Sequence, residues 1–122
     1  MHHALERWRE IAERVFPEDA RIIELPARTP HEANEWRLLV SWRLGTDPAR
    51  PSKRSKIVQI VIDDEALEDY AHSPIGARFA ADARLEAWLR AKWESFDGDH
   101  DTQERFYPPV VPWKVGTRDL NG

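Results

Sequence analysis

The segment WRLLVSWRL, residues 36–44, limits the fold more than any other part of the sequence, because every second side chain in it is apolar. A period of two is the pattern of a β-strand, in which alternate side chains point to the same face. An apolar face of this length needs a covering layer, so we expect this strand in the middle of a sheet. The apolar side chains are Trp36, Leu38, Val40, Trp42 and Leu44.

Helical and extended patterns flank this central strand. The amphipathic segment before it ends at Pro17, whose ring cannot continue a helical hydrogen-bond ladder. After it, Val58, Ile60 and Ile62 alternate as in another strand, and the pattern beyond Pro74 is typical of a long helix. The expected elements are helices at residues 4–16, 63–71 and 75–96, and strands at 20–25, 36–44 and 56–63.

These elements predict an α+β domain. A chain of 122 residues builds one hydrophobic core. We expect residues 1–104 to form a three-stranded antiparallel sheet, with the N-terminal helix and the long C-terminal helix on one face, in the order helix, strand, strand, strand, helix, helix. Residues 105–122, rich in proline and aromatic side chains, are expected to dock on this domain as an extended tail.

Several classes of site lack the residues they need. The sequence has no cysteine, no Gly-rich phosphate loop and no Gly-x-Ser-x-Gly motif, and its five histidines are scattered. We therefore expect no metal site, cofactor or small-molecule substrate, and an enzyme is the least supported class of function. No apolar run reaches the roughly 20 residues of a membrane span, so we expect a cytoplasmic protein.

One pair of carboxylates is a candidate for acid–base chemistry. Asp82 and Glu86 lie one helical turn apart on the predicted long helix. Such a pair acts in general acid–base catalysis when its environment shifts the pKa values. Arg78 and Arg90 stand four residues from Asp82 and Glu86 and are placed to neutralise them, so a purely structural role is the preferred interpretation.

A second acidic group resembles part of a calcium-binding loop. Asp97, Asp99 and Asp101 match the first, third and fifth positions of an EF-hand loop. Thr102 stands where the sharp turn needs glycine, and Pro108 stands where the loop needs a bidentate glutamate. We therefore interpret this segment as a solvated acidic turn.

Nucleic-acid binding is the alternative functional hypothesis. The loop at residues 50–56 carries four cations, which could follow a phosphate backbone beside Trp36 and Trp42. The element order resembles that of double-stranded RNA-binding domains, a family whose last helix opens with a lysine cluster. Here the sequence HSPIGAR, residues 72–78, stands at that point. The candidate residues are Arg50, Lys53, Arg54 and Lys56.

Protein binding is the first functional hypothesis. The element order and the acidic net charge of −4 also resemble those of secretion chaperones and toxin-immunity proteins, which bind another protein. Six tryptophans favour an interface, where this residue is enriched. We expect an adaptor-like, chaperone-like or immunity-like module that binds a protein partner or a second copy of the chain.

The expected interface has three parts. Exposed aromatic anchors are predicted at Trp88, Tyr107 and Trp113. An acidic helix, within residues 63–104 of net charge −8, would steer the partner. Leu39, Ile57 and Val61 would make the reverse face of the sheet apolar, so that face also needs a cover. Arg37 and Arg43 are expected to mark its edge.

Overall fold

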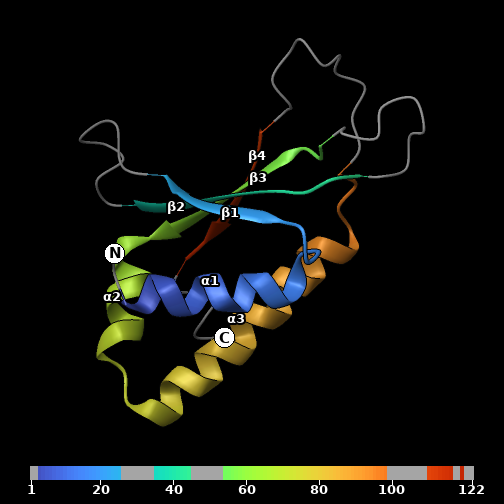
Figure 1. Ribbon diagram of the computed structural model, residues 1–122. Coiled ribbons are helices and arrows are strands. Elements are labelled where there is room, and N and C mark those ends of the chain that lie inside the picture. Colours follow the sequence, from blue (N-terminus) through green and yellow to red (C-terminus); the bar gives the residue numbers. More distant parts are fainter. Residues whose placement is uncertain (1–2, 26–34, 45–53, 99–109, 117–118, 120–122) are drawn as a thin grey trace.

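The fold is described by a computed structural model that covers residues 3–25, 35–44, 54–98, 110–116 and 119 (Figure 1). Within these residues, four strands form one sheet and three helices form a layer on one side of it, which confirms the α+β class. The elements in chain order are α1 (His3–Val15), β1 (Arg21–Leu25), β2 (Glu35–Ser41), β3 (Ile57–Asp63), α2 (Asp64–His72), α3 (Ile75–Glu94) and β4 (Val110–Val115).

The sheet is mixed, with the strand order β1-β2-β3-β4. The first three strands are antiparallel to one another, whereas β4 lies parallel to β3. The three expected strands are antiparallel to one another, as predicted. The prediction missed β4, because part of the expected extended tail is a strand that pairs parallel to β3. Pro112 fits in β4 because the strand lies at the edge of the sheet, where a residue without an N–H group is tolerated.

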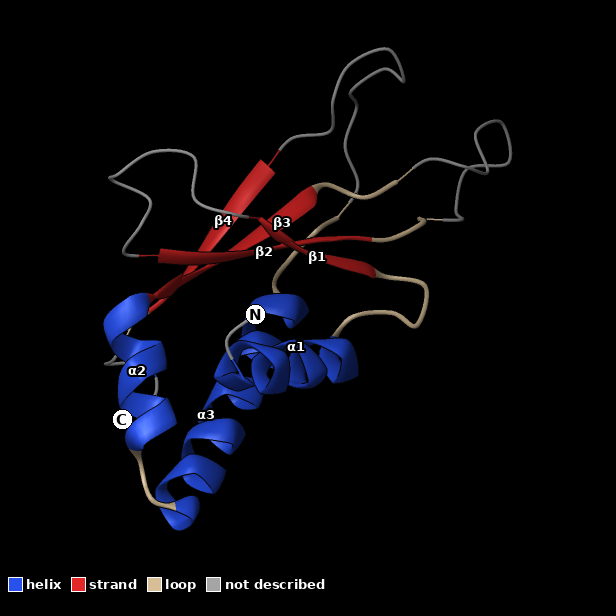
Figure 2. Cartoon of the chain, turned by 60° about the vertical axis from the view of Figure 1, so that its left-hand side comes forward, coloured by secondary structure: helices blue, strands red, loops and turns tan. Residues whose placement is uncertain are grey.

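All three helices lie on one side of the sheet (Figure 2). Leu5, Trp8 and Ile11 of α1 are almost fully buried, as are Leu85 and Leu89 of α3, so both helices turn their apolar sides inward. We call the sheet side that carries the helices the inner face. Its strand residues in the core are Ile22, Leu38, Val40, Val58, Ile60, Ile62, Trp113 and Val115.

An aromatic cluster closes one end of this core. Phe16 stacks on Trp113 with ring centroids 5.8 Å apart, and Trp42 meets Trp93 edge-on at 4.9 Å. Gly98 lies against Trp42 so closely that a Cβ atom there would come within 2.8 Å of the indole ring. The cluster therefore joins the ends of α1 and α3 to β4, and most of the tryptophans are used inside the fold.

None of the helices in the described part of the chain is long and apolar enough to cross a membrane.

Candidate protein-binding surface

The side of the sheet opposite the helices, here called the outer face, is covered by no described helix or strand (Figure 2). Strand register places Ile23 of β1 beside Leu39 of β2, and Leu39 beside Gln59 of β3. Ile23 is 57% exposed, whereas Leu39 and Gln59 are half-buried. Val110, at the other edge of the sheet, is also exposed. The outer face thus presents aliphatic side chains to solvent along its edges.

The middle of the outer face is less accessible than its edges. Arg37 is 7% exposed and Val61, its neighbour in register, is 6% exposed. The guanidinium of Arg37 donates to a carboxylate oxygen of Glu35 over 2.9 Å. Arg37 is therefore held inside the face rather than at the edge where the sequence predicted it, whereas Arg43 is exposed near one end of the sheet.

Three arginines meet at that end of the outer face. Arg21 pairs in register with Ser41, so the two side chains lie next to each other on the outer face. Arg43 follows two residues after Ser41, on the same side of the chain, and forms an isolated bridge with Arg54. The guanidinium of Arg54 donates to the Ser41 carbonyl oxygen over 2.9 Å and to the Ser41 hydroxyl oxygen over 3.1 Å. We call Arg21, Arg43 and Arg54 the cationic corner.

The charges at the cationic corner are not balanced by the described residues. Burial lowers the pKa of Arg54, and the positive charges of Arg21 and Arg43 lower it further. Asp19 opposes this effect, and its carboxylate also accepts a hydrogen bond from the backbone N–H of Arg43 over 3.0 Å. Arg21 and Arg43 form no ion pair with any other residue in the described ranges. Arg21 and Arg43 therefore present two exposed guanidinium groups whose charges no described carboxylate pairs with.

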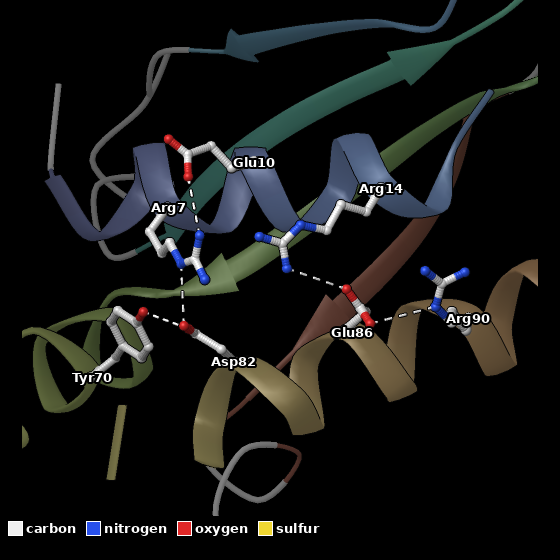
Figure 3. Close-up of polar contacts among 7 residues, drawn as sticks. All are labelled: Arg7, Glu10, Arg14, Tyr70, Asp82, Glu86 and Arg90. Atoms are coloured by element: carbon white, nitrogen blue, oxygen red, sulfur yellow. Dashed lines mark hydrogen bonds and ion pairs between the residues drawn. The ribbon is translucent and has the colours of Figure 1, made fainter. Parts of the chain in front are cut away.

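A second polar cluster, here called the balanced cluster, lies between the helices, where three arginines pair with three carboxylates (Figure 3). Asp82 of α3 accepts hydrogen bonds from the Tyr70 hydroxyl of α2 over 2.5 Å and from Arg7 Nε of α1 over 3.2 Å. Arg7 also pairs with Glu10. Burial, followed by the hydrogen bond to Asp82, raises the pKa of Tyr70 to about 12. This cluster ties three helices together and keeps the phenol protonated to a higher pH than an ordinary tyrosine.

Glu86, the other carboxylate considered for catalysis, also joins helices. It pairs with Arg14 of α1 over 3.5 Å and with Arg90 of α3 over 3.6 Å (Figure 3). The expected Arg90 pair is confirmed, whereas Asp82 is held by Arg7 and Tyr70. Each carboxylate has its own cationic partner, an arrangement that suits a structural role better than acid–base chemistry.

The aromatic residues predicted as anchors do not gather on one surface. Trp113 is 5% exposed and packs on Phe16 and Phe96 in the core. Trp88 of α3 is half-buried, with the Lys92 ammonium 5.5 Å from its ring centroid, and lies on the helical side of the molecule. Tyr107 lies outside the described residues. An anchor must be reachable by its partner, so Trp113 has no place on the candidate surface.

The basic loop is only partly within the described structure. Arg50 and Lys53 lie outside the described residues. Arg54 is bonded to Ser41, and the Lys56 ammonium lies 5.7 Å from the centroid of the Phe96 ring. The two described cations of this loop therefore already contact the protein itself.

Acidic side chains are concentrated on α2 rather than on the long helix. Asp64, Glu65, Glu68 and Asp69 belong to α2, whereas the cations of α3 outnumber its acids. Of the acidic turn, Asp97 is described, and Asp99 and Asp101 lie outside the described residues. Among the residues with a described position, no group of three or more His, Cys, Asp or Glu side chains could hold a metal ion.

Comparison with known proteins gives no relative from which a function could be transferred. No family model, no curated protein and no solved structure matches this chain significantly.

The cationic corner was not found from the sequence, although part of its signal was there. Arg43 was predicted to mark an interface edge on the outer face, and Arg54 was placed in a basic loop. Arg21 joins them only through the pairing of β1 with β2, since residues 21 and 43 are far apart in sequence. Strand register was the missing information.

Proposed function

We propose that this chain is a non-enzymatic protein-binding module that holds its partner on the outer face of the sheet, at the β1 edge. The observation that carries the proposal is the exposed Ile23, which lies on a face that no described helix or strand covers. Ile23 lies beside the half-buried Leu39, and adjacent apolar side chains on an uncovered sheet face are the kind of patch that favours an interaction surface. The partner is either another protein or a second copy of this chain.

The test is a capture experiment with matched variants. Wild-type protein, Ile23→Glu and the control Phe79→Glu are immobilised in equal amounts and exposed to extract of the native organism. Phe79 of α3 is 65% exposed on the helical side, so its variant makes the same type of change at another surface. A partner retained in stoichiometric amount by wild type and Phe79→Glu, and lost by Ile23→Glu, supports the proposal.

Two results would contradict this proposal. One is a partner lost equally with both variants, because the binding surface would then not be specific to the β1 edge. The other is the absence of both a retained partner and self-association, the latter measured by light scattering over a wide range of protein concentration.

Nucleic-acid binding remains the second candidate because the cationic corner includes Arg54 of the basic loop. We rank it below protein binding for two reasons. Arg54 and Lys56 already contact Ser41 and Phe96, and the register places aliphatic side chains beside the corner, where a single strand would need aromatic groups for base stacking. Titration with labelled RNA and DNA at low salt tests this alternative, since phosphate binding is strongest there.

A further inference from the structure

We propose that the cationic corner recognises an acidic, extended segment of a partner protein, which lies along the free edge of β1. This inference rests on the proposed protein-binding function and adds the chemistry of the partner. Its elements are the unbalanced charge at Arg21 and Arg43, the exposed Ile23 beside them, and the position of β1 at the end of the sheet.

The charge of the cationic corner determines which charged side chain the partner segment should carry. Arg21 and Arg43 are exposed, and Arg54 is held near them by its hydrogen bonds to Ser41. Guanidinium groups bind carboxylates through paired N–H donors, so an acidic side chain is a matched ligand for such a cluster. Neither Arg21 nor Arg43 forms an ion pair with another described residue, so the positive charges of these two exposed guanidinium groups are left for the partner to neutralise.

The geometry of β1 determines the conformation of the partner segment and the spacing of its side chains. In the strand order, β1 has β2 on one side and no described strand on the other. A free edge offers backbone N–H and C=O groups that can pair with an added strand. On the outer face, Arg21 and Ile23 are two residues apart, and this is also the spacing of same-face side chains in an extended peptide. The matching segment therefore carries an acidic residue and, two positions away, an aliphatic residue.

The inference is tested with synthetic peptides and the full-length chain. The probe is the nine-residue peptide TETVTETVT, which alternates glutamate and valine on one face, and the control probe is TKTVTKTVT. Each peptide is titrated into ¹⁵N-labelled protein at low salt, and the backbone amide signals are followed by NMR. We expect the glutamate peptide to shift the signals of residues 21–25 and the lysine peptide to leave them unchanged.

Two double variants separate local charge from total charge. Arg21→Gln with Arg43→Gln should weaken binding of the glutamate peptide by about tenfold or more. Arg9→Gln with Arg90→Gln removes the same charge from the helical side and should change it by less than about twofold. The comparison of the two peptides uses only wild-type protein, so it stands even if a variant is poorly folded.

Several outcomes would overturn the inference. These are no shift at residues 21–25, equal binding of the two peptides, or equal weakening by the two double variants. Tighter binding of a single-stranded oligonucleotide with the same number of negative charges, lost with Arg21→Gln and Arg43→Gln, would assign the corner to nucleic acid. A captured partner that depends on Ile23 but not on these arginines would overturn this inference while leaving the proposed function intact.

Discussion

Arg7 and Arg54 each donate hydrogen bonds to another side chain, yet the charges around them have opposite signs. Arg7 lies between Asp82 and Glu10, and its hydrogen bond to Asp82 is the main cause that raises its pKa. Arg54 donates to an uncharged serine beside two other arginines, and burial and these neighbours lower its pKa. The difference separates an arginine that is paired with carboxylates between helices from an arginine that lies in a group of like charges.

The largest effect is expected when the balanced cluster loses its acceptor. The Asp82 side chain is 13% exposed and accepts from both Tyr70 and Arg7. Asp82→Ala should lower the free energy of unfolding by about 3 kcal/mol, since both donors lose their partner. Asp82→Asn keeps an acceptor oxygen for Tyr70 and should cost less. Equal, small losses in urea unfolding would show that this cluster does not tie the helices together.

A smaller effect should distinguish the two arginines directly. Arg7→Met should lower the free energy of unfolding by about 1.5 kcal/mol, because the Asp82 carboxylate loses a charged donor. Arg54→Met should cost only about 0.5 kcal/mol, since loss of the bonds to Ser41 is partly offset by relief of like-charge repulsion. Urea unfolding of both variants measures the difference, and a larger loss for Arg54 would reverse the comparison.

The balanced cluster should also make the stability of the protein fall at alkaline pH. The pKa of Tyr70 is raised to about 12 from an ordinary value of 10.0, so the folded state keeps its phenol proton over a range in which the unfolded state loses it. The stabilisation is complete below pH 10 and is lost as the pH rises to about 12. Urea unfolding at pH 9, 10 and 11 should show a steeper loss for wild type than for Tyr70→Phe.

The smallest effect is expected at the cationic corner in the absence of a partner. Arg21→Gln removes one of three neighbouring positive charges and should raise stability by about 0.3 kcal/mol at low salt. The gain should disappear at about 1 M salt, where such charges are screened. Thermal unfolding at two salt concentrations measures it. Destabilisation by Arg21→Gln would contradict this comparison, because it would mean that Arg21 makes a stabilising interaction in the folded protein.

Periodicity was enough to predict the first three strands and the helices, because each pattern is local. The segment at residues 110–115 was missed for a physical reason. Val111, Trp113 and Val115 alternate as in a strand. Pro112 cannot donate a hydrogen bond to a neighbouring strand, so the sequence favoured the interpretation as an irregular tail. The segment is a strand because it lies at an edge. Two parallel neighbouring strands need a long connection, which is usually helical, and the two helical patterns between residues 63 and 110 indicate such a connection.

The candidate surface was less predictable because it depends on how strands pair. Tryptophan is a residue type that is enriched at interfaces, but Trp113 is buried in the core. A count of tryptophans in the sequence cannot show which of them are buried. Phe79 of α3 is exposed, although it belongs to a helix whose Leu85 and Leu89 are buried. Arg21 lies far from Arg43 in sequence and reaches it through the antiparallel register of β1 and β2. Such proximity follows from register, and a single sequence specifies register weakly.

The parallel pairing of β4 with β3 also has a consequence for the rate of folding. The antiparallel strands pair with their neighbours along the chain, whereas β4 must find β3 across residues 64–109, which include α2 and α3. Contacts between distant parts of a chain slow folding, because the chain loses conformational entropy in closing the long loop before the contact can stabilise it. Since Trp113 of β4 belongs to the aromatic cluster, we expect tryptophan fluorescence to report the slow, late step at which the core closes.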